Sequence, residues 1–400
     1  MSRREATSPD GRRDDPNARA PRILRCGSLV VPASRSEDMV TTEDERFMIR
    51  ALELARSVPN TSPNPKVGAV VARDGRIVGE GYHRGAGHPH AEADAIEGTD
   101  ASRAVLYVTL EPCVHHGLTP PCAPMIVASG IERVVIAIED PDPRVSGRGI
   151  AYLREHGVRV LTGVLAAEAA RDNAPFLHHR RTGRPLLTLK LALTLDGRLA
   201  APDGSANWIT GPETRRFVHE RRHEADAVMV GAGTIAADDA RLTVRAIEAS
   251  RQPARIVVDS SGRTPSQAAV FGAEAPTIVA TTERASPGAR EAWAGAGAEV
   301  LVLPASDQGV DLPALLDELG ARNLLDLYCE GGAALATSLL AEGCVDVLEI
   351  HYGPKVVGAG GPQLEDIGVK SLDDADQLEP LGVRSSGDDI IATYRFTGSA

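Results

Sequence analysis

The stretch AVLYVTLEPCVHHGLTPPCAPMIVASG, residues 104–130, joins a predicted strand to a predicted helix and carries two cysteines. Its first seven residues form an apolar run bounded by polar residues, which is typical of a buried strand. The segment from Pro121 predicts a helix that ends at Gly130. Cys113 therefore follows the strand and Cys122 opens the helix, which places both thiols at strand-to-helix junctions.

Similar elements surround this stretch. TEDE, Thr42–Glu45, predicts a capping box at the start of a helix that runs to Arg56. VGAVV and IVGEGYH, residues 67–71 and 77–83, flank the turn sequence ARDG and predict a hairpin. RVVIAI, residues 133–138, predicts another buried strand. Strands that alternate with helices indicate a layered α/β domain.

A second alternation follows the basic segment HHRRTGRP, residues 178–185, where we place the domain boundary. We expect a mostly parallel sheet, with helices between several of its strands. The predicted strands are residues 186–193, 227–231, 255–259, 277–281, 299–303, 324–330 and 347–352.

Composition restricts the classes of function. The 400 residues have a formal net charge of -12, which argues against a general binder of nucleic acid or anionic membranes. We expect residues 1–42 to be a disordered extension, because they are polar and contain no apolar run long enough for a signal peptide or a membrane span. Five cysteines without an export signal indicate the reducing cytoplasm.

HAE, His90–Glu92, lies before a predicted helix and upstream of both cysteines. Alone, this triplet would be an ordinary polar helix start. Together, one imidazole and two thiolates are ligands that Zn²⁺ favours, and three protein ligands leave a fourth position for a water molecule. Such a water is acidified and can act as a hydroxide nucleophile. Glu92 can reach that water without being a ligand, so we expect it to carry protons to the leaving amine.

This pattern resembles the zinc-dependent nucleobase deaminases, although the Cys-x8-Cys spacing is longer than the Cys-x2-Cys of most of them. The longer spacing is similar to that of the bifunctional riboflavin-biosynthesis deaminase/reductases. SPNPKVGAVV, GEGYHRGAGHPHAE and EDPDPRVSGRGI resemble the deaminase half of that family. LKLALTLDGRLA, NWIT, VGAGTIAADDARLTVR and CEGGAALATSLL resemble its reductase half.

The resemblance implies a cytidine-deaminase-like α/β/α domain over residues 43–182 and a dihydrofolate-reductase-like α/β domain over residues 183–400. It implies zinc-dependent hydrolytic deamination of a phosphoribosylaminopyrimidine, followed by NADPH-dependent reduction of the ribosyl group to ribityl. The zinc ligands would be His90, Cys113 and Cys122, and the proton carrier Glu92. Asn64, His83 and His115 would contact the pyrimidine, whereas we expect Gly81 and Gly85 to be turn residues without chemistry of their own.

The reductase half has its own implied site. Arg222 and Arg245 would hold the substrate phosphate, because a guanidinium can donate two hydrogen bonds to one anion. Glu330 and Leu242 would also contact the substrate, and Lys190 and Asp196 would polarise the reacting carbonyl. The expected NADPH-binding residues are Ala192, Trp208, Thr234, Asp238, Ser260, Gly332, Ala333, Ala334 and Leu335.

Five positions depart from the family pattern. Asp94 replaces a second histidine, Leu118 a basic residue and Ala206 a serine, while Thr194 and Ala240 stand where serine and proline are usual. These departures leave open a divergent paralogue that uses the same or a related pyrimidine in another pathway. A nucleic-acid-editing deaminase is the alternative from another class. We expect a small-molecule substrate, no nucleic-acid or membrane partner, and a possible homo-oligomer.

Overall fold

The structure is a computed structural model that describes residues 40–117, 119–143, 145–205 and 208–397. Most of the extension expected over residues 1–42 therefore lies outside the described residues, as do Leu118 and Ala206. No helix within the described ranges combines the length and the apolar character that crossing a membrane requires.

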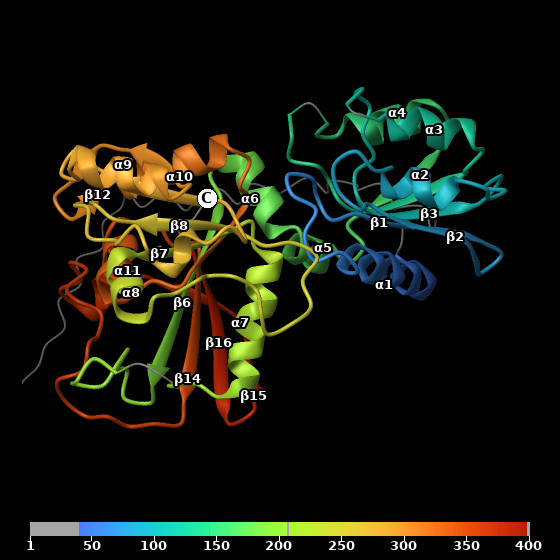
Figure 1. The fold of residues 1–400 in the computed structure, drawn as a ribbon. Coiled ribbons are helices and arrows are strands. Elements are labelled where there is room, and N and C mark those ends of the chain that lie inside the picture. The colour runs from blue at the N-terminus through green and yellow to red at the C-terminus, as the bar shows by residue number, and fades with distance from the viewer. Residues whose placement is uncertain (1–39, 118, 144, 206–207, 398–400) are drawn as a thin grey trace, which may run out of the picture. The chain divides into compact units, whose positions relative to one another are not determined.

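The first half is built on a five-stranded sheet with the order β2-β1-β3-β4-β5. β1 pairs antiparallel with β2 and β3, and β3, β4 and β5 run parallel (Figure 1). The strands are β1 Gly68–Arg73, β2 Arg76–Tyr82, β3 Val105–Leu110, β4 Arg133–Ile138 and β5 Arg159–Thr162. The helices are α1 Thr42–Arg56, α2 Ala91–Ile96, α3 Cys122–Ala128, α4 Arg148–Glu155, α5 Ala166–Asp172 and α6 Ala174–Thr182.

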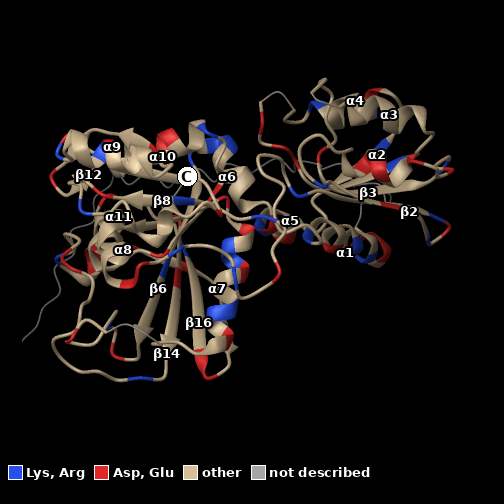
Figure 2. Cartoon of the chain, in the orientation of Figure 1, with Lys and Arg blue, Asp and Glu red and all other residues tan. Residues whose placement is uncertain are grey.

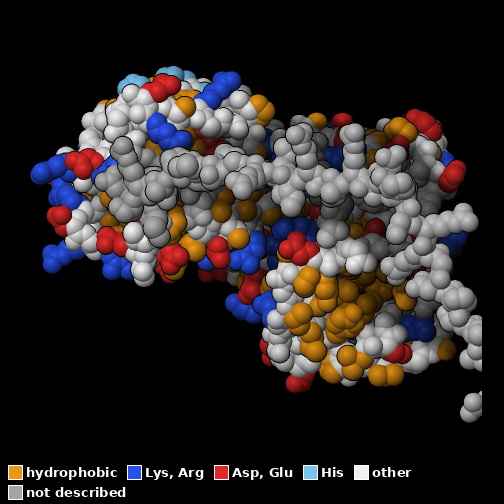
Figure 3. Space-filling view, turned by 180° about the vertical axis from the view of Figure 1, so that it is seen from behind, with side chains coloured by type: hydrophobic (Ala, Val, Ile, Leu, Met, Phe, Trp, Pro, Cys, Tyr) orange, Lys and Arg blue, Asp and Glu red, His pale blue; other side chains and the backbone are white. Residues whose placement is uncertain are grey.

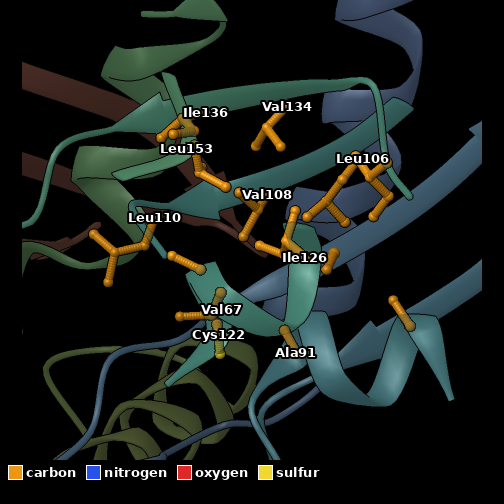
Figure 4. Close-up of a cluster of buried hydrophobic side chains, with 14 of the residues drawn as sticks. Val67, Ala91, Leu106, Val108, Leu110, Cys122, Ile126, Val134, Ile136 and Leu153 are labelled. Atoms are coloured by element: carbon orange, nitrogen blue, oxygen red, sulfur yellow. The ribbon is translucent and has the colours of Figure 1, made fainter. Parts of the chain in front are cut away.

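Side chains alternate between the two faces of this sheet and fill two separate cores. On one face, Val70 and Tyr107 pack with Met48 of α1 and Ala169 of α5. On the other face, Val71, Leu106, Val108 and Val134 pack with residues of α2, α3 and α4 (Figure 4). The expected α/β/α layering is confirmed.

The capping box at the start of α1 lies one residue earlier than expected. Thr41 is extended and accepts a hydrogen bond from the Asp44 backbone N–H, and the Asp44 carboxylate accepts one from the Thr41 backbone N–H. Asp44 takes this position because it is buried and pairs with Arg133 at 2.8 and 3.0 Å. The prediction of TEDE as the capping box was wrong for this reason.

Gly81 lies inside β2, so the expectation that it is a turn residue was wrong. A Cβ atom at this position would come within 2.3 Å of the Ala91 carbonyl oxygen and 2.4 Å of the Ala95 nitrogen. The missing side chain therefore allows α2 to lie directly on β2. This close packing fixes the start of α2, where His90 and Glu92 lie.

The second half contains a nine-stranded sheet with the order β10-β9-β8-β7-β13-β6-β14-β16-β15. Neighbouring strands are parallel except where β16 pairs with β14 and with β15, which confirms the expected mostly parallel sheet. The strands are β6 Leu186–Thr194, β7 Ala227–Gly231, β8 Ala254–Val258, β9 Thr277–Thr281, β10 Glu299–Val302, β13 Asp326–Cys329, β14 Val347–Gly353, β15 Leu378–Ser386 and β16 Asp389–Phe396. The short strands β11 Ala305–Ser306 and β12 Gly309–Val310 form a separate pair.

Helices cover both faces of the nine-stranded sheet. α10 and α11 contribute leucines to the core on one face, and α8 and α9 contribute Ile235 and Trp293 to the other. The helices are α7 Pro212–Glu224, α8 Ala232–Asp238, α9 Pro287–Gly295, α10 Leu312–Ala321 and α11 Ala333–Ala341, with short 3₁₀ turns at Ala269–Phe271 and Leu372–Asp374. Basic and acidic residues alternate along α7 (Figure 2).

Apolar side chains are also exposed in the second half. Figure 3 shows them gathered over the part of the molecule that contains β6, β14 and β16 in Figure 1. The terminal hairpin of β15 and β16 was not predicted. β15 is largely exposed and lacks apolar alternation, whereas β16 lies between β14 and β15 and is mostly covered. Exposed apolar residues of this half include Val356, Leu372, Val383 and Ile390.

Candidate active sites

His90, Cys113 and Cys122 converge as the sequence predicted. Their ligand atoms all lie within 4.8 Å of one another. His90 Nδ1 is 3.2 Å from Cys122 Sγ and 3.7 Å from Cys113 Sγ. A tetrahedral zinc with ordinary bond lengths separates such ligand atoms by about 3.5–3.8 Å. The three side chains therefore fit one zinc ion with little movement.

The folded chain positions these ligands through three separate elements. His90 is the N-cap residue of α2, Cys113 follows β3, and Cys122 begins α3. The Cys122 backbone N–H points at Cys113 Sγ at 3.4 Å, so the loop between them brings the two thiols together. Figure 4 shows Cys122 beside Val67 and Ala91 at the apolar core, which shields this side of the site from water.

The two thiols share a negative charge. The hydrogen bond from Cys122 is the main reason that the pKa of Cys113 is lowered, to about 4. The same contact raises the pKa of Cys122 above its usual value. The contact therefore favours the thiolate of Cys113, and a divalent ion would favour ionisation of both thiols.

Thr119 contacts the second ring nitrogen of His90. Its Oγ1 lies 3.0 Å from His90 Nε2, the ring nitrogen that faces away from the two sulfurs. A partner of this kind fixes the tautomer and the ring orientation of a metal-binding histidine. The sequence analysis did not single out Thr119, although its position three residues before Cys122 placed it close to the site.

Glu92 lies in the first turn of α2 and is 4 % exposed. Burial raises the pKa of its carboxyl to about 7. Glu92 is also close enough to His90 and Cys113 for their charges to act on it. A carboxyl with a pKa near neutrality can both accept and donate a proton, as a general acid–base group must.

These residues line a cavity of about 210 Å³, called here the first cavity. Asn64, His83 and His115 lie on its wall together with His90, Glu92 and Cys113. The structure therefore brings together all three residues that were expected to contact the pyrimidine, and their binding role stays a prediction. Leu118 lies outside the described residues.

His83 orients the Asn64 amide. His83 Nδ1 lies 2.9 Å from the Pro89 carbonyl oxygen, which can only accept, so Nδ1 carries the proton. Burial lowers the pKa of His83, which favours its neutral ring. His83 Nε2 therefore accepts a hydrogen bond from Asn64 Nδ2 at 2.8 Å. One N–H and the oxygen of the amide remain for a ligand with both a donor and an acceptor.

Glu111 organises the loop that closes one side of the first cavity. Its buried carboxylate accepts hydrogen bonds from the backbone N–H groups of Asp140, Gly147, Gly149 and Ile150, at 2.9–3.3 Å. This anchors the segment 140–150, from which Asp140, Asp142 and Val145 reach the cavity wall. The sequence analysis missed this role, since partners 29 to 39 residues away are not visible in local pattern.

Glu111→Gln is expected to lower the free energy of unfolding by about 2–4 kcal/mol, because the amide turns a donor towards backbone N–H groups and leaves them unpaired. Urea or thermal denaturation of the full chain measures this change. Glu139→Gln, an exposed glutamate close by, is the matched control. Equal stability of the two variants would contradict the anchoring role.

Asp94, which replaces a histidine of the family pattern, fastens the loop that carries His83. Its carboxylate accepts hydrogen bonds from the Tyr82 backbone N–H at 3.1 Å and from Arg84 at 3.0 Å. The aspartate at this position is therefore held by hydrogen bonds within this chain. It does not alter the zinc ligands or Glu92.

A second cavity, of about 360 Å³, lies in the half that contains the nine-stranded sheet. Seven of the nine residues expected to bind NADPH line it, and Ala192 and Trp208 do not. Trp208 is 64 % exposed, and the Arg215 guanidinium covers its ring at 4.0 Å. The lining residues among those predicted are Thr234, Asp238, Ser260, Gly332, Ala333, Ala334 and Leu335.

The N-terminus of α11 forms part of this wall. Gly332 is its N-cap residue, and the following residues present backbone N–H groups without partners inside the helix. A helix start of this kind suits a phosphate group. A Cβ atom at Gly332 would approach Thr234 Oγ1 to 3.2 Å, so the small residue keeps the two wall segments close.

Arg222 and Glu330 form a buried ion pair, which the sequence did not predict. Arg222 donates from Nε and Nη2 to the Glu330 carboxylate at 2.5 and 3.0 Å, and from Nη1 to the Thr243 carbonyl oxygen at 3.0 Å. The Arg222 charge, acting against burial, holds the pKa of Glu330 at about 2. Three of the five Arg222 N–H groups thus donate to protein acceptors. Only two N–H groups remain that could donate to a phosphate.

Arg245 has no ion pair among the described residues and lines a separate polar pocket with Arg241 and Thr243. Burial, and next the charge of Arg222, lower its pKa. Leu242 has a buried side chain in the core, so only its backbone can meet a ligand. The substrate-binding roles of Arg245 and Leu242 stay predictions.

Lys190 and Asp196 lie in different environments. Lys190 is half-buried, and the charges of Glu330 and Glu349 oppose the lowering of its pKa by desolvation. The Asp196 carboxylate instead accepts hydrogen bonds from Thr194 and from the backbone N–H groups of Val357 and Gly358. Lys190 thus shares a charged cluster with Glu330, whereas Asp196 holds two loop segments together.

Comparison with known proteins matches both halves to families. Residues 41–138 match the cytidine and deoxycytidylate deaminase zinc-binding region, and residues 185–392 match the RibD C-terminal domain. The chain is 41 % identical to the riboflavin biosynthesis protein RibD of Aquifex aeolicus over 361 residues, which cover 89 % of this chain and 99 % of that protein. It is 40 % identical to RibD of Escherichia coli, over 87 % of this chain and 98 % of the other.

Solved structures agree with these matches. Acinetobacter baumannii RibD superposes with a TM-score of 0.79 at 34 % identity, covering 89 % of this chain and 99 % of that one. A Thermotoga maritima protein superposes with a TM-score of 0.77 at 37 % identity, covering 88 % and 99 %. That protein is described as a diaminohydroxyphosphoribosylaminopyrimidine deaminase/5-amino-6-(5-phosphoribosylamino)uracil reductase.

Proposed function

Since this chain belongs to the RibD family of riboflavin biosynthesis proteins, we propose that its first cavity is the deaminase site and its second cavity the NADPH site of the reductase. The chain is a bifunctional enzyme, a zinc-dependent pyrimidine deaminase joined to an NADPH-dependent reductase. The deaminated substrate would be a diaminohydroxy-phosphoribosylaminopyrimidine, whose ribosyl group is then reduced to ribityl.

The convergence of His90, Cys113 and Cys122 beside the buried Glu92 carries the deaminase proposal. A zinc ion in this donor set supplies a Lewis acid that makes a water molecule acidic near neutral pH. Glu92 takes the proton of the attacking water and delivers it to the leaving amine. Asn64, oriented by His83, holds the pyrimidine edge, and the apolar core behind Cys122 excludes bulk water.

In the reductase half, the second cavity would hold NADPH, with Gly332 and the following residues against a cofactor phosphate. NADPH supplies the hydride, and the protein supplies position and electrostatics. The ion pair of Arg222 with Glu330 fixes both side chains, so Glu330 can present carboxylate oxygens to substrate hydroxyls. Arg245, which has no carboxylate partner within the described ranges, is the cation best placed for the substrate phosphate.

Arg245→Ala is expected to raise the reductase KM about 10-fold or more and to change kcat little, because a hydrogen bond to a charged group contributes roughly 1.5–3 kcal/mol. Reduction is measured as NADPH oxidation with the deaminated substrate. Arg216→Ala, an exposed arginine on α7 that pairs with Glu220, is the control. An unchanged KM for Arg245→Ala would contradict the phosphate assignment.

One experiment tests the whole function. The full chain is incubated with the phosphoribosylaminopyrimidine, with and without NADPH, and the product masses are measured. Deamination replaces an amino group by oxygen and adds about 1 Da, and subsequent reduction adds about 2 Da, as a hydride and a proton transfer requires. Absence of the first change would end the deaminase proposal, and a second change without NADPH would end the proposed cofactor role.

Two further expectations stay predictions. The first is association of copies of the chain, for which the exposed apolar side chains in Figure 3 offer a surface. Sedimentation or light scattering would measure it. The second is a cytoplasmic location, which localisation of the tagged full chain would test.

A further inference from the structure

The first cavity is lined by four carboxylic acids and four histidines but by few permanently charged cations. Glu92, Glu111, Asp140 and Asp142 line it, and Arg180 is the single lysine or arginine among its described lining residues. The carboxylate of Glu111 accepts hydrogen bonds from backbone N–H groups of the segment 140–150. An anionic substrate that enters this cavity therefore meets one guanidinium on its described wall, that of Arg180.

Arg180 is held in place by neutral partners. It lies in α6, donates from Nη2 to the Pro63 carbonyl oxygen at 3.3 Å, and stacks over the Phe176 ring at 4.9 Å. Its Nη1 lies 3.1 Å from His179 Nδ1, and His179 Nε2 lies 3.0 Å from the Gly320 carbonyl oxygen. Because a carbonyl can only accept, His179 carries its proton on Nε2 and accepts from Arg180 at Nδ1.

These contacts leave the guanidinium oriented and without a neutralising partner. Two of its five N–H groups are engaged, and none of the described carboxylates forms an ion pair with it. Its charge nevertheless acts within the cavity. Burial raises the pKa of Asp140 to about 6, and the Arg180 charge opposes that rise. A fixed guanidinium with free N–H groups beside a cavity matches a phosphate, which accepts two hydrogen bonds from one arginine.

We propose that Arg180 binds the phosphate of the pyrimidine substrate in the first cavity and makes the deaminase selective for the phosphorylated form. The proposal rests on the deaminase function proposed above. Leu118, on the loop between the two cysteine ligands, offers no charge because of its residue type. Arg144 is the single basic residue in the sequence of the segment 140–147 and lies outside the described residues, so the test includes a variant at this position.

The test compares two substrates, the phosphorylated pyrimidine and the same compound after enzymatic removal of its phosphate. Ammonia release by the full-length, zinc-loaded enzyme gives kcat and KM for each. Arg180→Met keeps an unbranched stem against Phe176 and removes the charge, whereas Arg180→Lys keeps a charge without the planar fork. Arg181→Met, an exposed arginine on the same helix and outside the cavity lining, is the control for general electrostatics.

Arg180→Met should raise KM for the phosphorylated substrate roughly 10- to 100-fold and leave kcat and the kinetics of the dephosphorylated substrate unchanged. Arg180→Lys should recover part of the loss, and Arg181→Met should show none. Inorganic phosphate should inhibit the wild type competitively and Arg180→Met much more weakly. These results would support the proposal.

Three results would overturn it. Equal losses on both substrates, with a lower melting temperature, would assign Arg180 a purely structural role between Pro63 and His179. A selective loss in Arg144→Met but not in Arg180→Met would move the phosphate contact to Arg144. Unchanged kinetics in Arg180→Met would remove the residue from substrate binding. A wild type inactive on both substrates would instead refute the deaminase function itself.

Discussion

Replacing Glu92 by glutamine will reduce ammonia release by about 10³-fold or more, while one zinc per chain is retained. Glutamine has nearly the same shape but cannot accept and return a proton, and general acid–base catalysis contributes 10²–10⁴-fold in rate. Glu92 serves two proton transfers in one turnover, so we expect the upper part of this range. Zinc should stay bound because Glu92 is not among the three converging ligands.

Ammonia release by the full chain measures this loss, and elemental analysis measures zinc. Glu97→Gln, an exposed glutamate at the end of α2, is the matched control and should keep full activity. Reductase activity on the deaminated substrate should be the same in both variants. Turnover of Glu92→Gln within a few-fold of the wild type would remove Glu92 from its role as the proton carrier.

Replacing Cys122 by serine will remove both zinc and deaminase activity. A serine hydroxyl is a poor zinc ligand at neutral pH, and His90 with Cys113 alone cannot complete a three-ligand site. Even the loss of a residue that only supports a ligand costs 10–100-fold in metal affinity, so removal of a ligand should cost more than 100-fold. Zinc content should fall from about one per chain to a small fraction.

Cys344→Ser provides the control, because Cys344 is also a buried free thiol but lies in the second half of the chain. It should keep its zinc and its ammonia release. Treatment of the wild type with a chelator should reproduce the effect of Cys122→Ser, and added zinc should reverse only the chelator effect. Deaminase activity in a variant shown to be free of metal would contradict the zinc site.

The predicted strands show where sequence patterns are informative. Strands β3, β4, β7 and β9 are short apolar runs between turn residues, and all were predicted within one or two residues. The hairpin of β15 and β16 was missed. The edge strand β15 is largely exposed and lacks the apolar pattern of buried strands, whereas β16 pairs on both sides and is mostly covered. The boundary segment 178–185 begins within α6, whose helix continues to Thr182.

Some residues of the candidate sites could be recognised in the sequence, and others only in the structure. His90, Glu92 and the two cysteines could be recognised because zinc chemistry restricts both residue type and spacing. Glu111, Thr119 and Arg180 could not, since their function depends on groups that the fold brings together from other parts of the chain. The departures at Asp94 and Thr194 also became interpretable only in the structure, where each has a hydrogen-bond partner.

By itself, the sequence determined the family and most element types, and it predicted the zinc ligands and the proton carrier, because each depends on residue chemistry and short-range spacing. Only the tertiary structure decided which charges are neutralised. It paired Arg222 with Glu330, surrounded Glu111 with backbone N–H groups, and left Arg180 without a carboxylate partner among the described residues. The physical reason is that electrostatic energy depends on distance and burial in space, and neither can be read from separation along the chain.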